Sequence, residues 1–360
     1  MRQPYSFIMV HPELSKVNPT TNETPLYRLL HDIETNVKPF ISIYHNFDVI
    51  GQFYGEFLRY TGGDKKGLGI VLTPKHITEL FAKIANLTPK TVVLDTCAGT
   101  SSFLISSMFE MIKKSKTDEE KLHIKKHCLI GVEQQPNMYA LASSNMILRG
   151  DGKANLYQGS CFDEAITKEV SNRAEVGMIN PPYSQKGEGL HELDFVNHLL
   201  NCLKPNGITI AVVPMSCAIS PHPMRDKILQ NHRLDAVMSL PDDVFYPIGV
   251  VTCIMVFTAH VPHEQNPHFK SWFGYWKNDG YIKTKTKGRI DAGTWKSIEQ
   301  NWLDGYFNRS EVPGLSVLKK VGTLDEWSAE AYMETDYSKI TEKDFMQSIK
   351  NYILIKIKEN

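Results

Sequence analysis

The chain has 360 residues, which suggests about two domains, and its 40 Lys+Arg are balanced by 40 Asp+Glu. This neutral charge argues against a protein that holds nucleic acid mainly through its own cationic surface, because neutralising phosphates requires an excess of positive charge. Hydrophobic residues at 42% exclude an intrinsically disordered chain. No apolar run approaches the ~20 residues of a membrane span, and the N-terminus lacks the apolar segment of a signal peptide. We therefore expect a cytoplasmic protein.

The six cysteines are scattered along the chain. They form no Cys-x-x-Cys pair and no Cys/His cluster at zinc spacing. This pattern favours reduced thiols in a reducing compartment, and we expect neither disulfides nor a metal site.

The predicted elements change in character at about residue 69. Before it, apolar residues at helical spacing predict helices between residues 25 and 60. After it, β-branched runs alternate with helical segments, which predicts an α/β fold with a mostly parallel sheet and helices on both faces. The seven expected strands are Thr91–Asp95, Cys128–Glu133, Ala154–Gln158, Glu175–Asn180, Gly207–Pro214, Arg233–Leu240 and Val250–Thr258. The clearest helices are Ser101–Lys113, Pro136–Arg149 and Leu193–Leu203.

Two further segments complete the organisation. The mixed charges of Lys113–Lys126 predict a solvated helix or loop and not a binding surface. The strand–helix alternation stops beyond Pro262, where aromatic and Gly/Lys-rich stretches follow. We therefore expect an N-terminal arm and helical region (1–68), a catalytic domain (69–262) and a separate, irregular and helical C-terminal module (263–360).

Polar residues follow the first two expected strands. The segment DTCAGTSSFL (95–104) places Asp95 at a strand end, and Ala98, Gly99 and Thr100 form a small-residue turn whose backbone could approach a ligand. The second strand ends at Glu133, whose carboxylate could accept hydrogen bonds from a ribose diol. Each signal alone is also compatible with simple packing or helix capping, but together they favour a ligand site.

The fourth strand ends in the tetrapeptide NPPY (180–183). The two prolines restrict the backbone, so the Asn180 amide oxygen and the Pro181 carbonyl form a fixed pair of acceptors suited to a planar –NH2 group. Accepting both hydrogens would expose the nitrogen lone pair, and Tyr183 adds an aromatic face for a planar substrate. This chemistry requires no separate nucleophile or base.

The order of these motifs resembles the γ-class N6-adenine DNA methyltransferases, and most closely the modification subunits of type I restriction–modification systems. The likeness covers residues 69–260. It rests on GIVLTPKHI (69–77), DTCAGTSSFL (95–104), GVEQQPNMYALASSNMILRG (131–150), MINPPYS (178–184) and LPDDVFYPIGVVTCIMVF (240–257). The resemblance implies a class I S-adenosylmethionine-dependent methyltransferase fold, which is a Rossmann-like sheet of seven strands with an antiparallel last strand.

The resemblance also implies roles for individual residues. The cofactor-binding set would be Thr73, Pro74, Asp95, Ala98, Gly99, Thr100, Glu133, Asn180 and Asp163. The catalytic set would be Asn180, Pro181, Pro182, Tyr183 and Phe245, with Phe245 stacking on the other face of a flipped adenine. Two positions depart from the family: Leu72 stands where an aromatic is usual, and Ser160 stands where an acid is usual. Either Ser160 or Asp163 could contact the cofactor adenine.

The implied activity is methyl transfer from S-adenosylmethionine to N6 of an adenine rotated out of double-stranded DNA. The implied partners are a DNA-specificity subunit, which would dock on the helical segments at both ends, and also a restriction subunit. Two alternatives stay open. One is a protein-glutamine methyltransferase, because such enzymes also use NPPY. The other is a non-catalytic DNA-binding subunit with the same fold.

Overall fold

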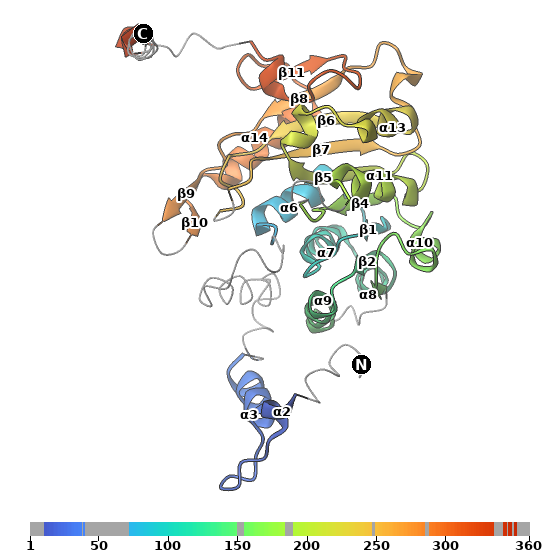
Figure 1. Ribbon diagram of the computed structural model, residues 1–360, viewed down its shortest axis with the longest axis vertical. Coiled ribbons are helices and arrows are strands. Elements are labelled where there is room, and N and C mark those ends of the chain that lie inside the picture. The colour runs from blue at the N-terminus through green and yellow to red at the C-terminus, as the bar shows by residue number, and fades with distance from the viewer. Residues whose placement is uncertain are drawn as a thin grey trace.

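A computed structural model of the chain (Figure 1) describes residues 11–37, 39, 72–149, 155–183, 190–246, 249–284, 288–334, 341–343, 345–347 and 349–350. Of the helices expected between residues 25 and 60, α3 (Pro25–Asp32) and the π-helical turn η1 (Ile33–Val37) are present. The remainder, except residue 39, lies outside the described residues, as do residues 69–71 of the GIVLTPKHI segment.

The seven expected strands are present and share one sheet. The sheet contains nine strands in the order β11-β8-β6-β7-β5-β4-β1-β2-β3. Strands β1 to β5 run parallel, whereas β7 is antiparallel to both β5 and β6. The expected antiparallel last strand is therefore confirmed. The seven are β1 (Val93–Asp95), β2 (Leu129–Glu133), β3 (Leu156–Gln158), β4 (Val176–Ile179), β5 (Ile208–Pro214), β6 (Arg233–Ser239) and β7 (Thr252–Thr258).

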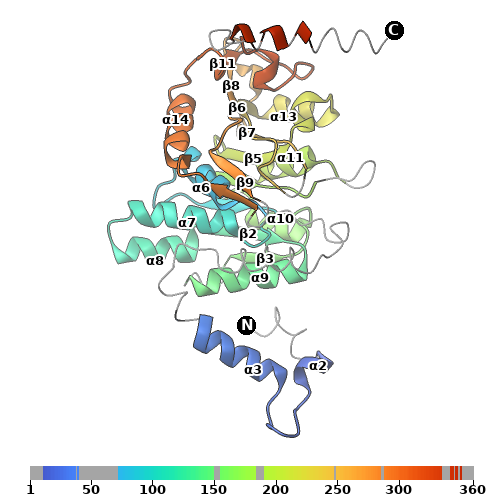
Figure 2. The same cartoon turned by 90° about the vertical axis from the view of Figure 1, so that its left-hand side faces the viewer.

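Helices cover both faces of the sheet (Figures 1 and 2). Alternate residues of a strand point to opposite faces, and accordingly Val93 and Leu94 belong to two different apolar clusters. One cluster is closed by α6 (Lys75–Ile84), α7 (Ser102–Lys114), part of α8 (Asp118–His127) and α14 (Trp295–Phe307). The other is closed by α10 (Glu164–Val170), α11 (Glu192–Cys202) and α13 (Pro223–Asn231). The remaining helices of the domain are α9 (Pro136–Leu148) and α12 (Ser216–Ile219).

The charged segment 113–126 forms the end of α7 and most of α8. A capping box begins α8: the Thr117 hydroxyl accepts the Glu120 N–H (3.1 Å), and the Glu120 carboxylate lies within reach of the Thr117 N–H (3.4 Å). Ile124 is the one buried residue of α8. The expectation of a solvated helix is confirmed.

The segment beyond residue 262 adds to the same sheet. After the short 3-10 turn η2 (His263–Gln265), β8 (Ser271–Tyr275) pairs parallel with β6, and β11 (Ser316–Lys319) pairs antiparallel with β8. A hairpin of β9 (Tyr281–Thr284) and β10 (Gly288–Asp291) precedes α14, and η3 (Ala329–Ala331) follows β11. The sheet therefore continues across the boundary expected at residue 262. The C-terminal segment does not form a separate module here, because two of its strands complete the edge beside β6.

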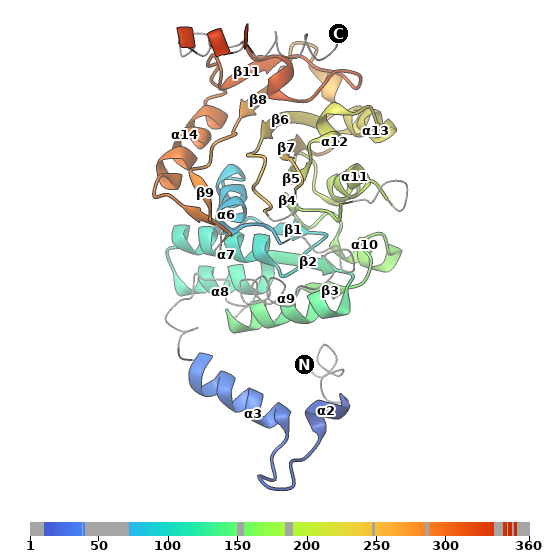
Figure 3. The ribbon, with the colours of Figure 1, turned by 60° about the vertical axis from the view of Figure 1, so that its left-hand side comes forward.

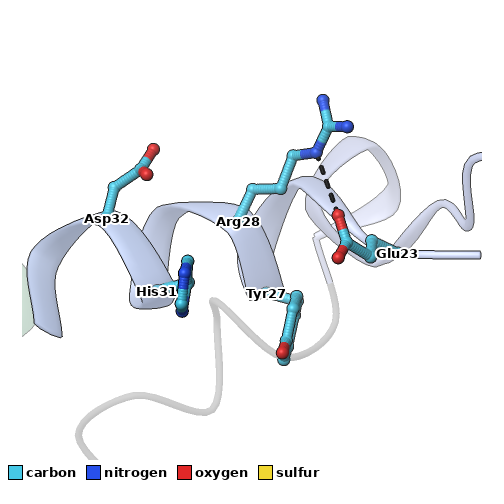
Figure 4. A pocket seen from close by; sticks show the side chains of 5 residues that line it. All are labelled: Glu23, Tyr27, Arg28, His31 and Asp32. Atoms are coloured by element: carbon cyan, nitrogen blue, oxygen red, sulfur yellow. Dashed lines mark hydrogen bonds and ion pairs between the residues drawn. The ribbon is translucent and has the colours of Figure 1, made fainter. Parts of the chain in front are cut away.

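The N-terminal helices lie apart from the sheet (Figure 3). Neither α2 (Pro12–Ser15) nor α3 buries a residue, and both begin at a proline, which suits the first helical position. Arg28 Nε donates to a Glu23 carboxylate oxygen at 3.1 Å, at a surface pocket that Tyr27, His31 and Asp32 also line (Figure 4). No helix in the described part of the chain is long and apolar enough to cross a membrane.

Candidate active site

The turn after β1 holds a buried carboxylate. Asp95 is the last residue of β1 and is fully buried. The Cys97 N–H donates to Asp95 Oδ1 at 3.0 Å, whereas Oδ2 is buried without a hydrogen-bond partner. Burial raises the pKa of Asp95 to about 8, the Cys97 N–H opposes this increase, and the nearby Glu133 carboxylate adds to it. Asp95 is therefore a buried acid with one oxygen available to a ligand.

The small-residue turn packs directly on the second strand end. Gly99 adopts a left-handed φ of 54°, and its N–H donates to Glu133 Oε2 at 2.8 Å. The Gln135 N–H donates to the other Glu133 oxygen at 2.7 Å. Ala98 N–H donates to the Val132 carbonyl at 2.9 Å. The structure thus brings the two predicted ligand-binding strand ends together.

The hydrogen bonds of Glu133 also affect its charge. Burial raises the pKa of Glu133, and the backbone N–H groups of Gln135 and Gly99 partly offset this rise because they stabilise the carboxylate. Thr100 is buried, and its carbonyl accepts a hydrogen bond from the Asn145 side-chain amide at 2.9 Å. These contacts fix the turn against α9.

The NPPY segment, predicted to be catalytic, lies at the adjacent strand end. Asn180 directly follows β4, and its Nδ2 donates to Thr73 Oγ1 at 3.0 Å. Pro74 is the N-cap residue of α6, so Thr73 lies just before this helix. Pro181 is buried and Pro182 is exposed. Thr73, expected to line the cofactor pocket, thus contacts the asparagine predicted to be catalytic.

Two aromatic rings meet beside this motif. The centroids of Tyr183 and Phe245 are 6.2 Å apart, and their planes are inclined by 82°. Phe245 is 3% exposed. The Tyr183 hydroxyl is buried without a hydrogen-bond partner, and burial raises its pKa. The structure therefore brings the two residues together, but edge to face. A planar base between them would require one ring to turn.

The third strand end gives both candidate residues a local role. Asp163 is the N-cap of α10, is exposed, and accepts the Ala165 N–H at 2.9 Å. The Ser160 hydroxyl accepts the Phe162 N–H at 3.3 Å. The assignment of either residue to the cofactor adenine stays a prediction.

Three features near these strand ends were not predicted from the sequence. Phe162 is 38% exposed, and its ring lies 5.0 Å from that of Phe195. The thiols of Cys97 and Cys161 interact, and this interaction raises the pKa of Cys97 and lowers that of Cys161. The Ser101 hydroxyl is buried without a partner. Only the exposed aromatic could have been noticed in the sequence, because the other two depend on how the turns fold.

A mixed group of possible metal ligands lies near Tyr183. Ligand atoms of His191, Glu192 and Cys217 lie within 4.8 Å of one another. However, His191 Nδ1 accepts the Leu193 N–H at 3.2 Å as the cap of α11, so the ring proton is on Nε2. A protonated nitrogen cannot bind a metal, and Nε2 instead faces Glu192 Oε2 at 3.7 Å. The expectation that the site uses no metal stays a prediction.

Comparison with known proteins identifies the family. The family model described as N-6 DNA Methylase matches residues 45–360. The chain belongs to this family. It is 34% identical, over 98% of its length, to the Type II restriction enzyme and methyltransferase RM.BcgI of Heyndrickxia coagulans, of which 56% is covered. It is 26% identical to the Type I restriction enzyme EcoKI methylase subunit of Escherichia coli K12, with 59% of this chain and 44% of that protein aligned.

The chain thus spans about half the length of the curated relatives it matches. Solved structures show the same fold. A methyltransferase subunit of a type I restriction–modification system from Streptococcus thermophilus has a TM-score of 0.58, with 21% identity, 76% of this chain and 60% of that chain covered. A chain of a type I R-M system assembly has a TM-score of 0.65 at 19% identity, covering 98% of this chain and 87% of that chain. The expected methyltransferase fold is confirmed.

Proposed function

We propose that this N-6 DNA methylase transfers a methyl group from S-adenosylmethionine to N6 of an adenine in double-stranded DNA, as the modification activity of a restriction–modification system. One observation carries the proposal. At the carboxyl edge of the parallel strands, the Asn180 amide and the Tyr183 and Phe245 rings lie one strand away from the Asp95 turn. In open α/β sheets, ligands bind at this edge.

The residues of the β1 and β2 ends fit the cofactor. The unpartnered, buried Asp95 Oδ2 would accept a hydrogen bond from the ammonium of the methionine end. Each Glu133 oxygen accepts one backbone N–H and has capacity for another donor, so Glu133 would hold the ribose hydroxyls. When bound, the cofactor supplies a sulfonium methyl group. The small-residue turn would bring its backbone close to the cofactor at Ala98, Gly99 and Thr100.

The residues of the β4 end fit the target amine. Asn180 and the Pro181 carbonyl would accept the two N6 hydrogens, which withdraws the nitrogen lone pair from the ring. The chain's contribution is then mainly orientation and electrostatic stabilisation of the developing positive charge. An adenine paired within a duplex cannot reach these groups, so the base must leave the stack at a cost of a few kcal/mol. Tyr183 and Phe245 would offset this cost by stacking.

We also propose partners for the chain. Its formal net charge of +0 leaves sequence recognition to another protein, and a DNA-specificity subunit would supply it. The N-terminal helix α3 buries no residue of its own and exposes Leu29 and Leu30, which suits docking. A restriction subunit would complete the system.

Variants at Asn180 test the proposal. The chain is produced, with its partners where needed, in a host lacking adenine methylation, and methylated adenines are read by single-molecule sequencing. Asn180→Ala is expected to lower methyl transfer at least ~10²-fold, with cofactor affinity measured by calorimetry retained. Asn201→Ala is the matched control, because Asn201 is exposed on α11. Near-normal transfer by Asn180→Ala would refute the proposal. Methylation of a glutamine peptide in preference to DNA would favour the protein-glutamine alternative.

A further inference from the structure

A buried ion pair lies at the base of the β9–β10 hairpin. Arg289 Nη1 and Nη2 donate to the two carboxylate oxygens of Asp279 at 2.8 and 2.7 Å. The two side chains are 8% and 2% exposed, respectively. This two-point geometry fixes the orientation of the guanidinium as well as its position. Arg289 is thus held rigidly, although it lies outside the segment that carries the family motifs.

Asp279 connects this pair to helix α6. His76 Nε2 lies 3.2 Å from Asp279 Oδ2, and since an ionised carboxylate only accepts, the histidine donates. The His76 ring also stacks on Tyr281 of β9, with centroids 4.1 Å apart, so that the hairpin and α6 lie side by side (Figure 3). His76 is in the first turn of α6, three residues after Thr73. The hairpin therefore holds the segment that contacts the catalytic asparagine.

Arg289 also contacts the segment that carries Phe245. Its Nε lies 3.1 Å from Asp243 Oδ1. Asp243 precedes Phe245 by two residues, and the Phe245 ring meets Tyr183. One guanidinium thus joins carboxylates from two segments, which the single ammonium of a lysine cannot do in the same geometry.

We infer that Arg289 is a positioning residue for methyl transfer, which through Asp279 and Asp243 sets the spacing between the Thr73 segment, beside Asn180, and the Phe245 segment, beside Tyr183. The inference deepens the proposed function and rests on it. If Arg289 served only to stabilise the fold, its ion pair with Asp279 would be sufficient. The additional contact with Asp243, two residues before Phe245, ties the hairpin to the residues proposed to hold the target base, where a misplacement of about 1 Å can reduce the rate ~10²-fold.

Two neighbouring aspartates give a matched pair of variants. Asp243→Asn removes the charge that faces both Arg289 and Lys283, whose Nζ lies 3.4 Å from Asp243 Oδ2, and leaves the buried Arg289–Asp279 pair intact. Asp242→Asn is the control, because Asp242 makes an ion pair of 2.8 Å with Lys277 but its side chain is 75% exposed and does not contact the hairpin pair. Arg289→Lys is a second test, since it keeps the positive charge but loses the two-point hydrogen bonding of the guanidinium. Thermal unfolding and calorimetric cofactor affinity show that each variant is folded and binds the cofactor.

The readouts are kcat and KM on a duplex that contains the methylated sequence, and the fluorescence of 2-aminopurine placed at the target adenine. We expect Asp243→Asn and Arg289→Lys to lower kcat at least tenfold, with cofactor affinity within about threefold of wild type and altered 2-aminopurine emission. Asp242→Asn should match wild type. If Asp243→Asn and Arg289→Lys keep the kcat of the control, the positioning role is refuted while the proposed function stands. If the wild-type chain with its partners transfers no methyl group to DNA, both fail.

Discussion

Replacing Asp95 tests the electrostatics of the site directly. Burial raises its pKa from 3.8 to about 8, because desolvation disfavours the charged carboxylate. Between these values the folded chain retains a proton that the unfolded chain has lost, so the free energy of unfolding must fall as the pH rises from about 4 to about 8. Each pH unit in this window contributes about 1.4 kcal/mol. Over the whole window, the burial of Asp95 therefore lowers the free energy of unfolding by at most roughly 5 kcal/mol.

Asp95→Asn removes this penalty, because the amide has no acidic proton and its oxygen can still accept the Cys97 N–H. The free energy of unfolding of the variant minus that of wild type is expected to be larger at pH 8 than at pH 5 by roughly 3 kcal/mol. Urea unfolding followed by tryptophan fluorescence measures this gain. Asp242→Asn, at a largely exposed side chain, is the control. An Asp95→Asn gain that is equal at pH 5 and pH 8 would refute the reasoning.

Four further outcomes are expected. Binding of S-adenosylmethionine at pH 7 should release nearly one proton as Asp95 ionises, measured by calorimetry in buffers of different ionisation enthalpy; no release would contradict the pKa near 8. Glu133→Gln should weaken cofactor binding about tenfold, because an amide offers one acceptor oxygen for two backbone N–H groups; unchanged calorimetric affinity would argue against this role. Gly131→Val should lower the free energy of unfolding by about 1–3 kcal/mol, since its Cβ would lie 2.6 Å from Leu156 Cδ2; urea unfolding checks this. Thr117→Ala should cost about 1 kcal/mol in the same assay and leave methyl transfer unchanged, because Thr117 only caps α8.

The sequence predicted the fold well because the sheet is buried on both faces. Its strands are short apolar runs that contrast with the capped helices between them, and β5 and β7 are buried almost throughout. The continuation of the sheet beyond residue 262 was missed. Pairing of β8 with β6 joins segments distant in the chain, and nothing in the aromatic run Trp272–Trp276 specifies its partner strand.

The candidate site was likewise predicted from the sequence only in part. Asp95, Gly99, Glu133 and Asn180 could be placed because each ends or follows a strand of the parallel part of the sheet, where strand ends meet at one edge. The contact between Asn180 and Thr73 follows from the packing of α6, which periodicity does not specify. The Arg289 network was not foreseen either, since a buried arginine and an exposed one have the same sequence signature.

The pairing of β8 with β6 has a practical consequence for preparing the catalytic unit. Within β6, residues Ala236–Ser239 are buried and pair with β8, so that some of their backbone N–H and C=O groups bond to it. A fragment that stopped at residue 262 would leave these N–H and C=O groups unpaired on an apolar edge, which is a template for aggregation. Deletion from the C-terminal side should therefore end after β11 if the fragment is to remain monomeric.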